Sequence, residues 1–217
     1  MDEQHRLVKV RLEKAESLRS LGVNPYPHRY DPTHLAQNIT ESFNELSAQE
    51  TDVKIAGRLI SIRTAGKTTF AHLEDHTGRM QLYFRRDELG EELWEIVGLL
   101  DIGDIIGAEG FMFRTRTGEM TVHVKNAEVL TKTIRPLPVV KSQESDEGDL
   151  KTFDDFSGNK ELRYRQRSVD LAVHSDVRDV FKARSKIMAT IRRVMDEERF
   201  VEVETPMLQP VYGGASA

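Results

Sequence analysis

The chain of 217 residues contains no cysteine, only one tryptophan and 7% aromatic residues. The absence of cysteine excludes disulfides, thiolate metal sites and cysteine nucleophiles, and it is typical of a reducing compartment. No apolar run approaches the ~18 residues that a membrane span needs, and the N-terminus lacks the charged-then-apolar pattern of a signal peptide. We therefore expect a cytoplasmic protein that does not cross a membrane.

The sequence also lacks the basic excess that proteins use to hold nucleic acid by bulk electrostatics, since its net charge is −5. The charge is uneven, because residues 141–161 hold seven acids and three bases, whereas residues 163–199 hold ten bases and six acids. Local basic surface is therefore compatible with the acidic total. The histidines are scattered without a helical His-x-x-x-His pair, and we interpret His72 and His123 as packing or surface residues rather than metal ligands.

The spacing of apolar residues predicts a small barrel that follows an N-terminal helix. A period of about 3.6 predicts a helix over 2–21, which Gly22 ends. From Val53 the period is two, which predicts strands over 53–63, 68–75, 79–85, 104–115 and 119–130, with turns near Gly66, Gly78 and Gly118 and a helix over about 87–100. Three strands, a helix and two strands are the order of a five-stranded Greek-key barrel of the OB type.

The remaining sequence predicts a linker and the start of a second domain. Residues 136–161 combine prolines with a Ser/Glu/Asp/Gly cluster and little apolar periodicity, as in linkers. Three- and four-residue apolar spacings predict an amphipathic helix of about 22 residues from Val177, and alternation predicts a strand over 200–204. We thus expect a helical extension over 1–50, the OB domain over 51–138, an acidic linker over 139–161 and a partial α+β domain over 162–217.

Three side chains on adjacent predicted strands suit the recognition of a splayed RNA base: Arg63, Phe70 and Gln81. An aromatic ring provides a stacking platform, and an amide and a guanidinium can read the hydrogen-bonding edge of the base. The strand-two and strand-three face of OB barrels is the usual oligonucleotide surface. Taken without further context, a phenylalanine such as Phe70 is more often a core residue than a stacking platform, and Gln81 is interpretable as an ordinary exposed strand residue.

The barrel sequence resembles the anticodon-binding domain of class II aminoacyl-tRNA synthetases of the aspartate, asparagine and lysine group. The similar runs are 53–58, Gly66-Lys67, 70–75 and 78–83. The flanking runs 21–27, 113–119, 130–132, 135–138, 163–167 and 169–171 narrow the resemblance to bacterial-type lysyl-tRNA synthetases, over nearly the whole chain. The resemblance implies that Arg63, Phe70 and Gln81 grip the central uridine of the anticodon.

The segment from about 177 to 208 is similar to class II motif 1, a helix, strand and proline at the homodimer interface, with Pro206 as the motif proline. Without the family, the same helix is interpretable as a core helix of an incomplete domain. Gly213, Gly214 and Ala215 resemble the loop at the edge of the lysine pocket, and a plain flexible tail is the alternative. Two departures from the family are the long acidic loop from Val139 to Lys160 and Ser168, where an aromatic residue is common.

The resemblance implies a full-length homodimeric enzyme that uses ATP and magnesium to activate lysine and transfers the lysine to its tRNA. The arginines and carboxylates of motifs 2 and 3 do not occur in the sequence, so we expect no catalytic and no metal-binding residue within it, no bound cofactor and no adenylation by this chain alone. The alternative is a stand-alone, non-catalytic RNA-binding or interaction module with an OB fold.

Overall fold

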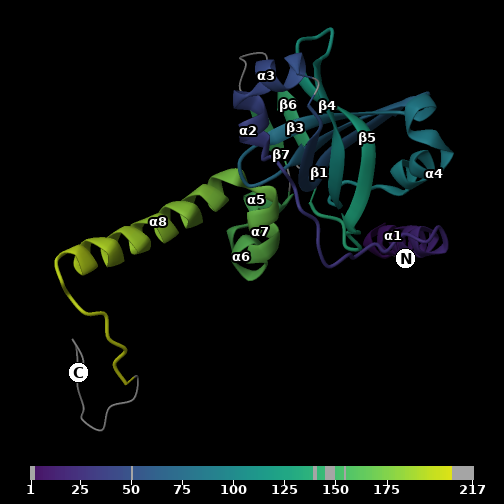
Figure 1. Cartoon of the computed structure of the whole chain (residues 1–217). Helices are drawn as coiled ribbons and strands as arrows, with labels where there is room; N and C mark the ends of the chain where they lie inside the picture. Colours follow the sequence, from purple (N-terminus) through teal and green to yellow (C-terminus); the bar gives the residue numbers. More distant parts are fainter. Residues whose placement is uncertain (1–2, 50, 139–140, 145–149, 154, 207–217) are drawn as a thin grey trace. The chain divides into compact units, whose positions relative to one another are not determined.

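The computed structural model describes residues 3–49, 51–138, 141–144, 150–153 and 155–206. The chain divides into two compact units, Met1–Leu137 and Pro138–Ala217. The first unit contains a closed five-stranded barrel with strand order β1-β2-β3-β5-β4 (Figure 1). Its strands are β1 (Val53–Ala65), β2 (Thr68–Glu74), β3 (Arg79–Arg85), β4 (Ile105–Arg114) and β5 (Met120–Thr131).

The strand order confirms the predicted OB fold. Neighbouring strands are antiparallel except β3 and β5, which are parallel, and β1 closes the barrel by pairing with β4. Helix α4 (Arg86–Leu99) lies between β3 and β4 in the sequence, as predicted. Gly66 adopts a φ of 60° at the turn between β1 and β2, which glycine tolerates without strain, so that Ala65 pairs with Thr68 across a tight hairpin.

Alternation along the strands decides which side chains fill the barrel. Apolar residues at every second position point inward and are almost fully buried: Val53, Ile55, Leu59, Leu73, Leu82, Phe84, Ile106, Met112, Val122 and Val124. The residues between them point outward. The side chains on the outer face of the barrel are therefore not needed to fill its core.

Helix α1 (Glu3–Ser20) is attached to the barrel unit by packing and by charge. Its Leu18 is fully buried in the hydrophobic core. Lys14 Nζ lies 2.7 Å from the Asp101 carboxylate. The same carboxylate lies 2.5 Å from Nζ of Lys132, whose side chain is completely buried and also lies 2.7 Å from Asp104. A buried ion-pair network thus joins α1 to the connection between α4 and β4, which contains both Asp101 and Asp104.

Two short helices that the sequence pattern did not reveal, α2 (Ala36–Glu41) and α3 (Phe43–Ala48), lie on a different side of the barrel from α1 (Figure 1). Their buried residues Ile39, Phe43 and Leu46 belong to the barrel core. Six-residue helices have too few turns to show a period, which explains the omission. The Asp75 carboxylate accepts a hydrogen bond of 2.7 Å from the first amide of α2.

The second unit contains a two-stranded hairpin and four helices in its described part. These are β6 (Lys141–Glu144), β7 (Leu150–Phe153), α5 (Asp155–Gly158), α6 (Lys160–Arg165), α7 (Arg167–Val173) and α8 (Ser175–Glu197). The hairpin and α5 fall within the segment that composition predicts as a linker. The long helix is confirmed, but the strand predicted over 200–204 is wrong, because these residues find no pairing strand among those that the structure describes.

Candidate nucleic-acid interface

Strand pairing brings the three predicted RNA-contacting residues to one outer face of the barrel. Arg63 on β1 lies directly opposite Phe70 on β2, and Phe70 lies directly opposite Tyr83 on β3. Directly opposed residues share a face, and so do residues two apart on one strand, which places Gln81 with Tyr83. Leu82, between them, is fully buried inside the barrel. The pattern therefore collects a guanidinium, a ring and an amide on the surface of β1, β2 and β3.

Phe70 is a partly exposed residue of this outer face and not a residue of the barrel interior. Its ring centroid lies 4.9 Å from that of Tyr83, and the two planes are tilted by 43°. Its neighbours along the strand, Thr69 and Ala71, are the residues that point inward and are buried. One side of the Phe70 ring is thus supported by Tyr83, while the residue keeps exposed surface on which a base can stack.

The aromatic surface continues from Phe70 across three further strands. Tyr83 contacts Phe113 on β4 and His123 on β5, with centroid distances of 5.7 and 5.0 Å. His123 in turn lies 4.8 Å from Phe111 on β4. Rings in such edge and tilted contacts hold one another in place. This aromatic strip, made of Phe70, Tyr83, Phe113, His123 and Phe111, forms a rigid support behind the predicted stacking residue.

The Gln81 amide is held in one orientation by two neighbours. Gln81 is only 9% exposed. Its Oε1 accepts a hydrogen bond of 2.7 Å from the hydroxyl of Thr121, which is fully buried on β5. Its Nε2 donates a hydrogen bond of 2.5 Å to the carboxylate of Glu119. Because a carboxylate only accepts, the amide nitrogen must face Glu119 and the amide oxygen must face Thr121.

Glu119 and His72 are residues of this surface that sequence reasoning missed. His72 Nε2 lies 2.8 Å from the second oxygen of Glu119, and His72 Nδ1 lies 2.8 Å from the Ser61 hydroxyl. Alternation along β2, which places residues two apart on one face, is the signal that could have put His72 beside Phe70. Nothing in the sequence indicated that Glu119, beyond the turn at Gly118, meets His72 across 47 positions of the chain.

Arg63 is exposed, and its guanidinium makes no hydrogen bond or ion pair within the part of the chain that the structure describes. The β4–β5 turn carries two more arginines near this face. Arg114 donates to the Gly118 carbonyl at 2.7 Å and lies 4.8 Å from the Phe43 ring centroid, whereas Arg116 is exposed. Arg63 and Arg116 therefore offer charge to a ligand, and Arg114 stabilises the turn.

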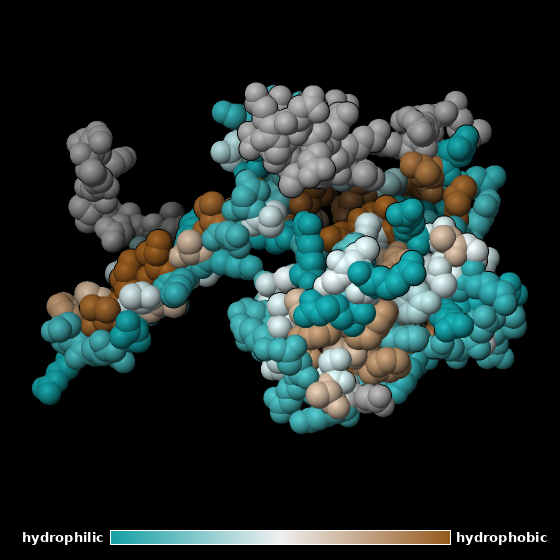
Figure 2. Space-filling view, turned by 90° about the horizontal axis from the view of Figure 1, so that it is seen from above, coloured by the Kyte–Doolittle hydropathy of each residue, from teal (hydrophilic) through white to brown (hydrophobic). Residues whose placement is uncertain are grey.

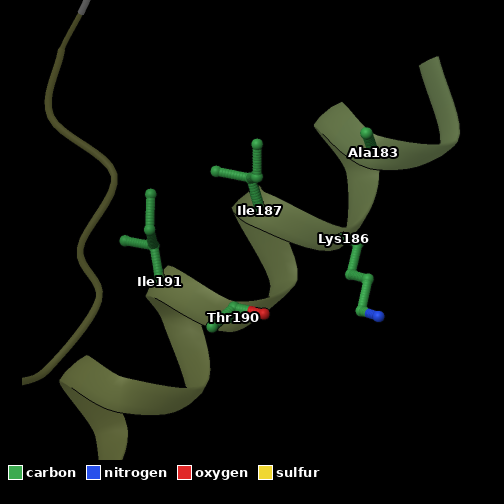
Figure 3. Close-up of a pocket in the computed structure, with 5 residues that line it drawn as sticks. All are labelled: Ala183, Lys186, Ile187, Thr190 and Ile191. Atoms are coloured by element: carbon green, nitrogen blue, oxygen red, sulfur yellow. The ribbon is translucent and has the colours of Figure 1, made fainter. Parts of the chain in front are cut away.

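In the second unit, the interface prediction concerns helix α8 and Pro206. Pro206 is exposed, and Gly213, Gly214 and Ala215 lie outside the described residues. Apolar side chains remain exposed along α8, as Figure 2 shows: Val180, Phe181, Ile187, Met188, Ile191, Val194 and Met195. Ile187 and Ile191 project from the same side of the helix beside a shallow hollow that Ala183, Lys186 and Thr190 also line (Figure 3).

A buried carboxylate organises the helices before α8. Asp170 on α7 is fully buried, and its oxygens contact Arg167, Arg163 at 2.8 Å and His174 at 2.8 Å. Burial raises the pKa of Asp170, but the hydrogen bonds from Arg163 and His174 and the nearby positive charges outweigh it and lower the pKa below its ordinary value. The cluster ties α6, α7 and the start of α8 together.

Metal-ligand clusters and membrane-spanning helices are both absent from the residues that the structure describes. No group of three or more histidine, aspartate or glutamate side chains in the described ranges is arranged to hold a metal ion. Among the helices in the described part of the chain, none has the length and apolar character needed to cross a membrane. The outer face of β1, β2 and β3 thus presents a supported aromatic ring, an oriented amide and a guanidinium together.

Comparison with known proteins finds two protein families that match separate parts of the chain. Residues 53–130 match the OB-fold nucleic acid binding domain family, and residues 159–217 match the family described as tRNA synthetases class II (D, K and N). The chain is 45% identical over 215 residues to the lysine–tRNA ligase of Carboxydothermus hydrogenoformans, covering 99% of this chain and 41% of that protein.

Further relatives give the same picture. The chain is 45% identical over 213 residues to the lysine–tRNA ligase of Syntrophomonas wolfei, covering 97% of this chain and 40% of that protein. It is 44% identical over 217 residues to the enzyme of Moorella thermoacetica, covering 100% of this chain and 41% of that protein. The chain therefore spans about two-fifths of the length of the curated relatives it matches.

Proposed function

We propose that the chain is the tRNA-recognising part of a lysine–tRNA ligase, because its residues 159–217 match the class II tRNA synthetases of the D, K and N group and nearly the whole chain is similar to lysine–tRNA ligases. We propose further that the outer face of β1, β2 and β3 binds the anticodon of lysine tRNA. The observation that carries the proposal is the convergence of Arg63, Phe70 and Gln81 on that face. Sequence-specific RNA recognition usually targets single-stranded loops, and an anticodon is such a loop.

Each residue has a distinct task in this proposal. The ring of Phe70, supported by Tyr83, stacks on the central base of the anticodon. The Gln81 amide keeps one free N–H and one free oxygen lone pair for the edge of the base, since Glu119 and Thr121 occupy the others. The exposed guanidinium of Arg63 binds the base or the neighbouring phosphate.

The activity proposed for the whole enzyme is the ATP-dependent activation of lysine and the transfer of lysine to its tRNA. The family implies the use of ATP and magnesium. We assign the described residues no step of adenylation, because the arginines and carboxylates that the resemblance assigns to ATP and magnesium do not occur in the sequence. The described part of the chain contributes the choice of tRNA.

We also propose that the exposed apolar stripe of α8, with Pro206 beyond it, contributes to a homodimer interface. An apolar surface of this kind needs a covering partner in water. The domain boundaries proposed are a helical extension over 1–50, the anticodon-binding domain over 51–138, a connecting segment over 139–161 and the start of the catalytic domain over 162–217. The edge of the lysine pocket is proposed for Gly213, Gly214 and Ala215.

Fluorescence anisotropy tests the RNA-binding proposal. The full chain is titrated, at one fixed salt concentration, into labelled hairpin RNAs with a UUU anticodon loop, with UCU in its place, or with a scrambled loop. Tighter binding to the UUU loop, weakened by Arg63→Gln, supports the proposal. Equal affinity for the UUU, UCU and scrambled loops contradicts it.

A further inference from the structure

We propose that His72 is a positioning residue that fixes the orientation of the Gln81 amide through Glu119, and thereby sets the preference for uracil over cytosine. The inference rests on the proposed function, because it concerns the base that this face reads. The observation that carries it is a continuous hydrogen-bond chain across the outer face of the barrel. Its members are Ser61 on β1, His72 on β2, Glu119 after the β4–β5 turn, Gln81 on β3 and Thr121 on β5.

The two ends of the chain are better fixed than its middle. Thr121 is fully buried on β5, and Ser61 pairs with His72 in the β1–β2 ladder. The Glu119 side chain is 46% exposed beside the turn, so its carboxylate has room to rotate into water. Two donors keep it in place: Gln81 Nε2 at 2.5 Å on one oxygen and His72 Nε2 at 2.8 Å on the other. His72 is therefore one of only two groups that hold the side-chain carboxylate of Glu119 among the described residues.

The protonation pattern of His72 follows from its neighbours. A carboxylate oxygen accepts hydrogen bonds, so the Nε2 atom that faces Glu119 must carry a hydrogen. The Ser61 hydroxyl at Nδ1 can donate to a neutral ring or accept from a charged one. Glu119 thus selects the ring form with a hydrogen on Nε2, and the Ser61 hydroxyl can complement it at Nδ1.

The orientation of the amide matters because uracil and cytosine differ in the order of donors and acceptors. Uracil presents an N–H between two carbonyl oxygens, whereas cytosine presents a bare ring nitrogen beside an amino group. A glutamine amide that can rotate by 180° pairs with either edge, since its oxygen and its NH2 group exchange places. With Thr121 at the oxygen and Glu119 at the nitrogen, only one order is available. Without His72, Glu119 is less constrained, and the Gln81 amide samples both orientations.

The test measures the dissociation constants of hairpin RNAs with UUU and UCU loops for the wild-type chain, His72→Ala, His72→Gln and His28→Ala. His72→Ala is expected to lower the uridine-over-cytidine preference by about fivefold to tenfold, which corresponds to the net value of one ordinary hydrogen bond. His72→Gln, which can still donate to Glu119, is expected to restore part of that preference. His28→Ala changes an exposed histidine elsewhere in the first unit and is expected to keep the wild-type ratio.

An unchanged preference in His72→Ala overturns the inference, and so does an equal loss of affinity for both RNAs, because a merely structural role would weaken both. His72 has 36% of its side chain exposed, so its truncation leaves no buried cavity. Should His72→Ala fail to fold by circular dichroism, Ser61→Ala takes its place, with a smaller loss of preference expected and an unchanged preference again overturning the inference. A wild-type chain that shows no preference at all contradicts the proposed function instead, so the two failures are distinguishable.

Discussion

The amide nitrogen of Gln81 donates a 2.5 Å hydrogen bond to the carboxylate of Glu119, a residue 38 positions away in the sequence. The contact joins β3 to the start of β5 and places a negative charge next to the amide that we propose reads the anticodon. A base that approaches Gln81 therefore meets the two carboxylate oxygens of Glu119, which accept hydrogen bonds, as well as the amide. Glu119 and Thr121 thus hold the Gln81 amide in one orientation.

Glu119→Gln is expected to lower the uridine-over-cytidine preference by about fivefold, because His72 and Gln81 bond to different oxygens of Glu119 and glutamine replaces one of them with an NH2 group that cannot accept. Loss of a negative charge is expected at the same time to strengthen binding to both RNAs at low salt. Anisotropy titrations at two salt concentrations separate the two effects. Glu92→Gln removes an exposed carboxylate on α4 and serves as the control; if it changes the preference equally, the role of Glu119 is refuted.

Phe70→Leu is expected to weaken binding of the UUU hairpin by about 1 to 3 kcal/mol, because it removes the stacking ring and keeps an apolar side chain against Tyr83. Phe70→Tyr retains the ring and is expected to bind like the wild type. The measurement is a pair of anisotropy titrations, accompanied by thermal melts to show that the barrel is intact. Equal affinity of the leucine and tyrosine variants would show that the Phe70 ring does not contribute to RNA binding.

Lys132→Met is expected to reduce the free energy of unfolding of the barrel unit by about 3 to 5 kcal/mol, because it leaves the buried carboxylate of Asp104 without its cation. Lys67→Met, which breaks an exposed pair with Asp87, is the matched control and is expected to cost less than about 1 kcal/mol. Urea titrations followed by the fluorescence of Trp94, the single tryptophan, report on this unit. Similar costs for the two variants would show that the buried network is not a structural requirement.

Acid is expected to destabilise the barrel unit through Asp101. Burial raises the pKa of Asp101, but the hydrogen bonds from Lys132 and Lys14 outweigh it and lower the pKa below its ordinary value. The stability that Asp101 contributes is therefore full above the unfolded pKa of about 3.9 and is lost as the pH falls through the lower folded pKa.

Urea titrations between about pH 5 and pH 2 measure this dependence. Asp101→Asn is expected to flatten the dependence of unfolding free energy on pH, because the titrating group is gone. Asp31→Asn, at an exposed pair with Arg29, is expected to leave the slope unchanged. A slope in Asp101→Asn as steep as in the wild type would show that other carboxylates dominate.

The apolar stripe of α8 is expected to make the chain self-associate, so that the mean sedimentation coefficient rises with protein concentration. The double variant Ile187→Glu, Ile191→Glu places charge in the stripe and is expected to remain monomeric. Ala189→Glu is the control, because two residues turn a helix by about 200° and place it on the other side. A wild-type chain that stays a monodisperse monomer at every concentration would contradict the interface.

The elements with a long, regular pattern could be predicted from the sequence. The five strands and the helix α4 lie within a few residues of their predicted positions, because alternation over a whole strand is an unambiguous signal. The helices α2 and α3 were missed because one and a half turns show no period. The predicted strand over 200–204 failed for another reason: its alternation is real, but a strand needs a partner, and the described residues supply none.

The sequence by itself determined the order of the barrel strands, since alternation marked the five strands, and the family resemblance pointed to Arg63, Phe70 and Gln81 as the predicted stacking and reading residues. Only the tertiary structure decided how the reading amide is held. The chain from Ser61 through His72 and Glu119 to Gln81 and Thr121 joins residues from separate strands and a turn, at separations that local pattern does not record. Hydrogen bonds depend on distances of a few tenths of an ångström, and the closure of the barrel sets those distances.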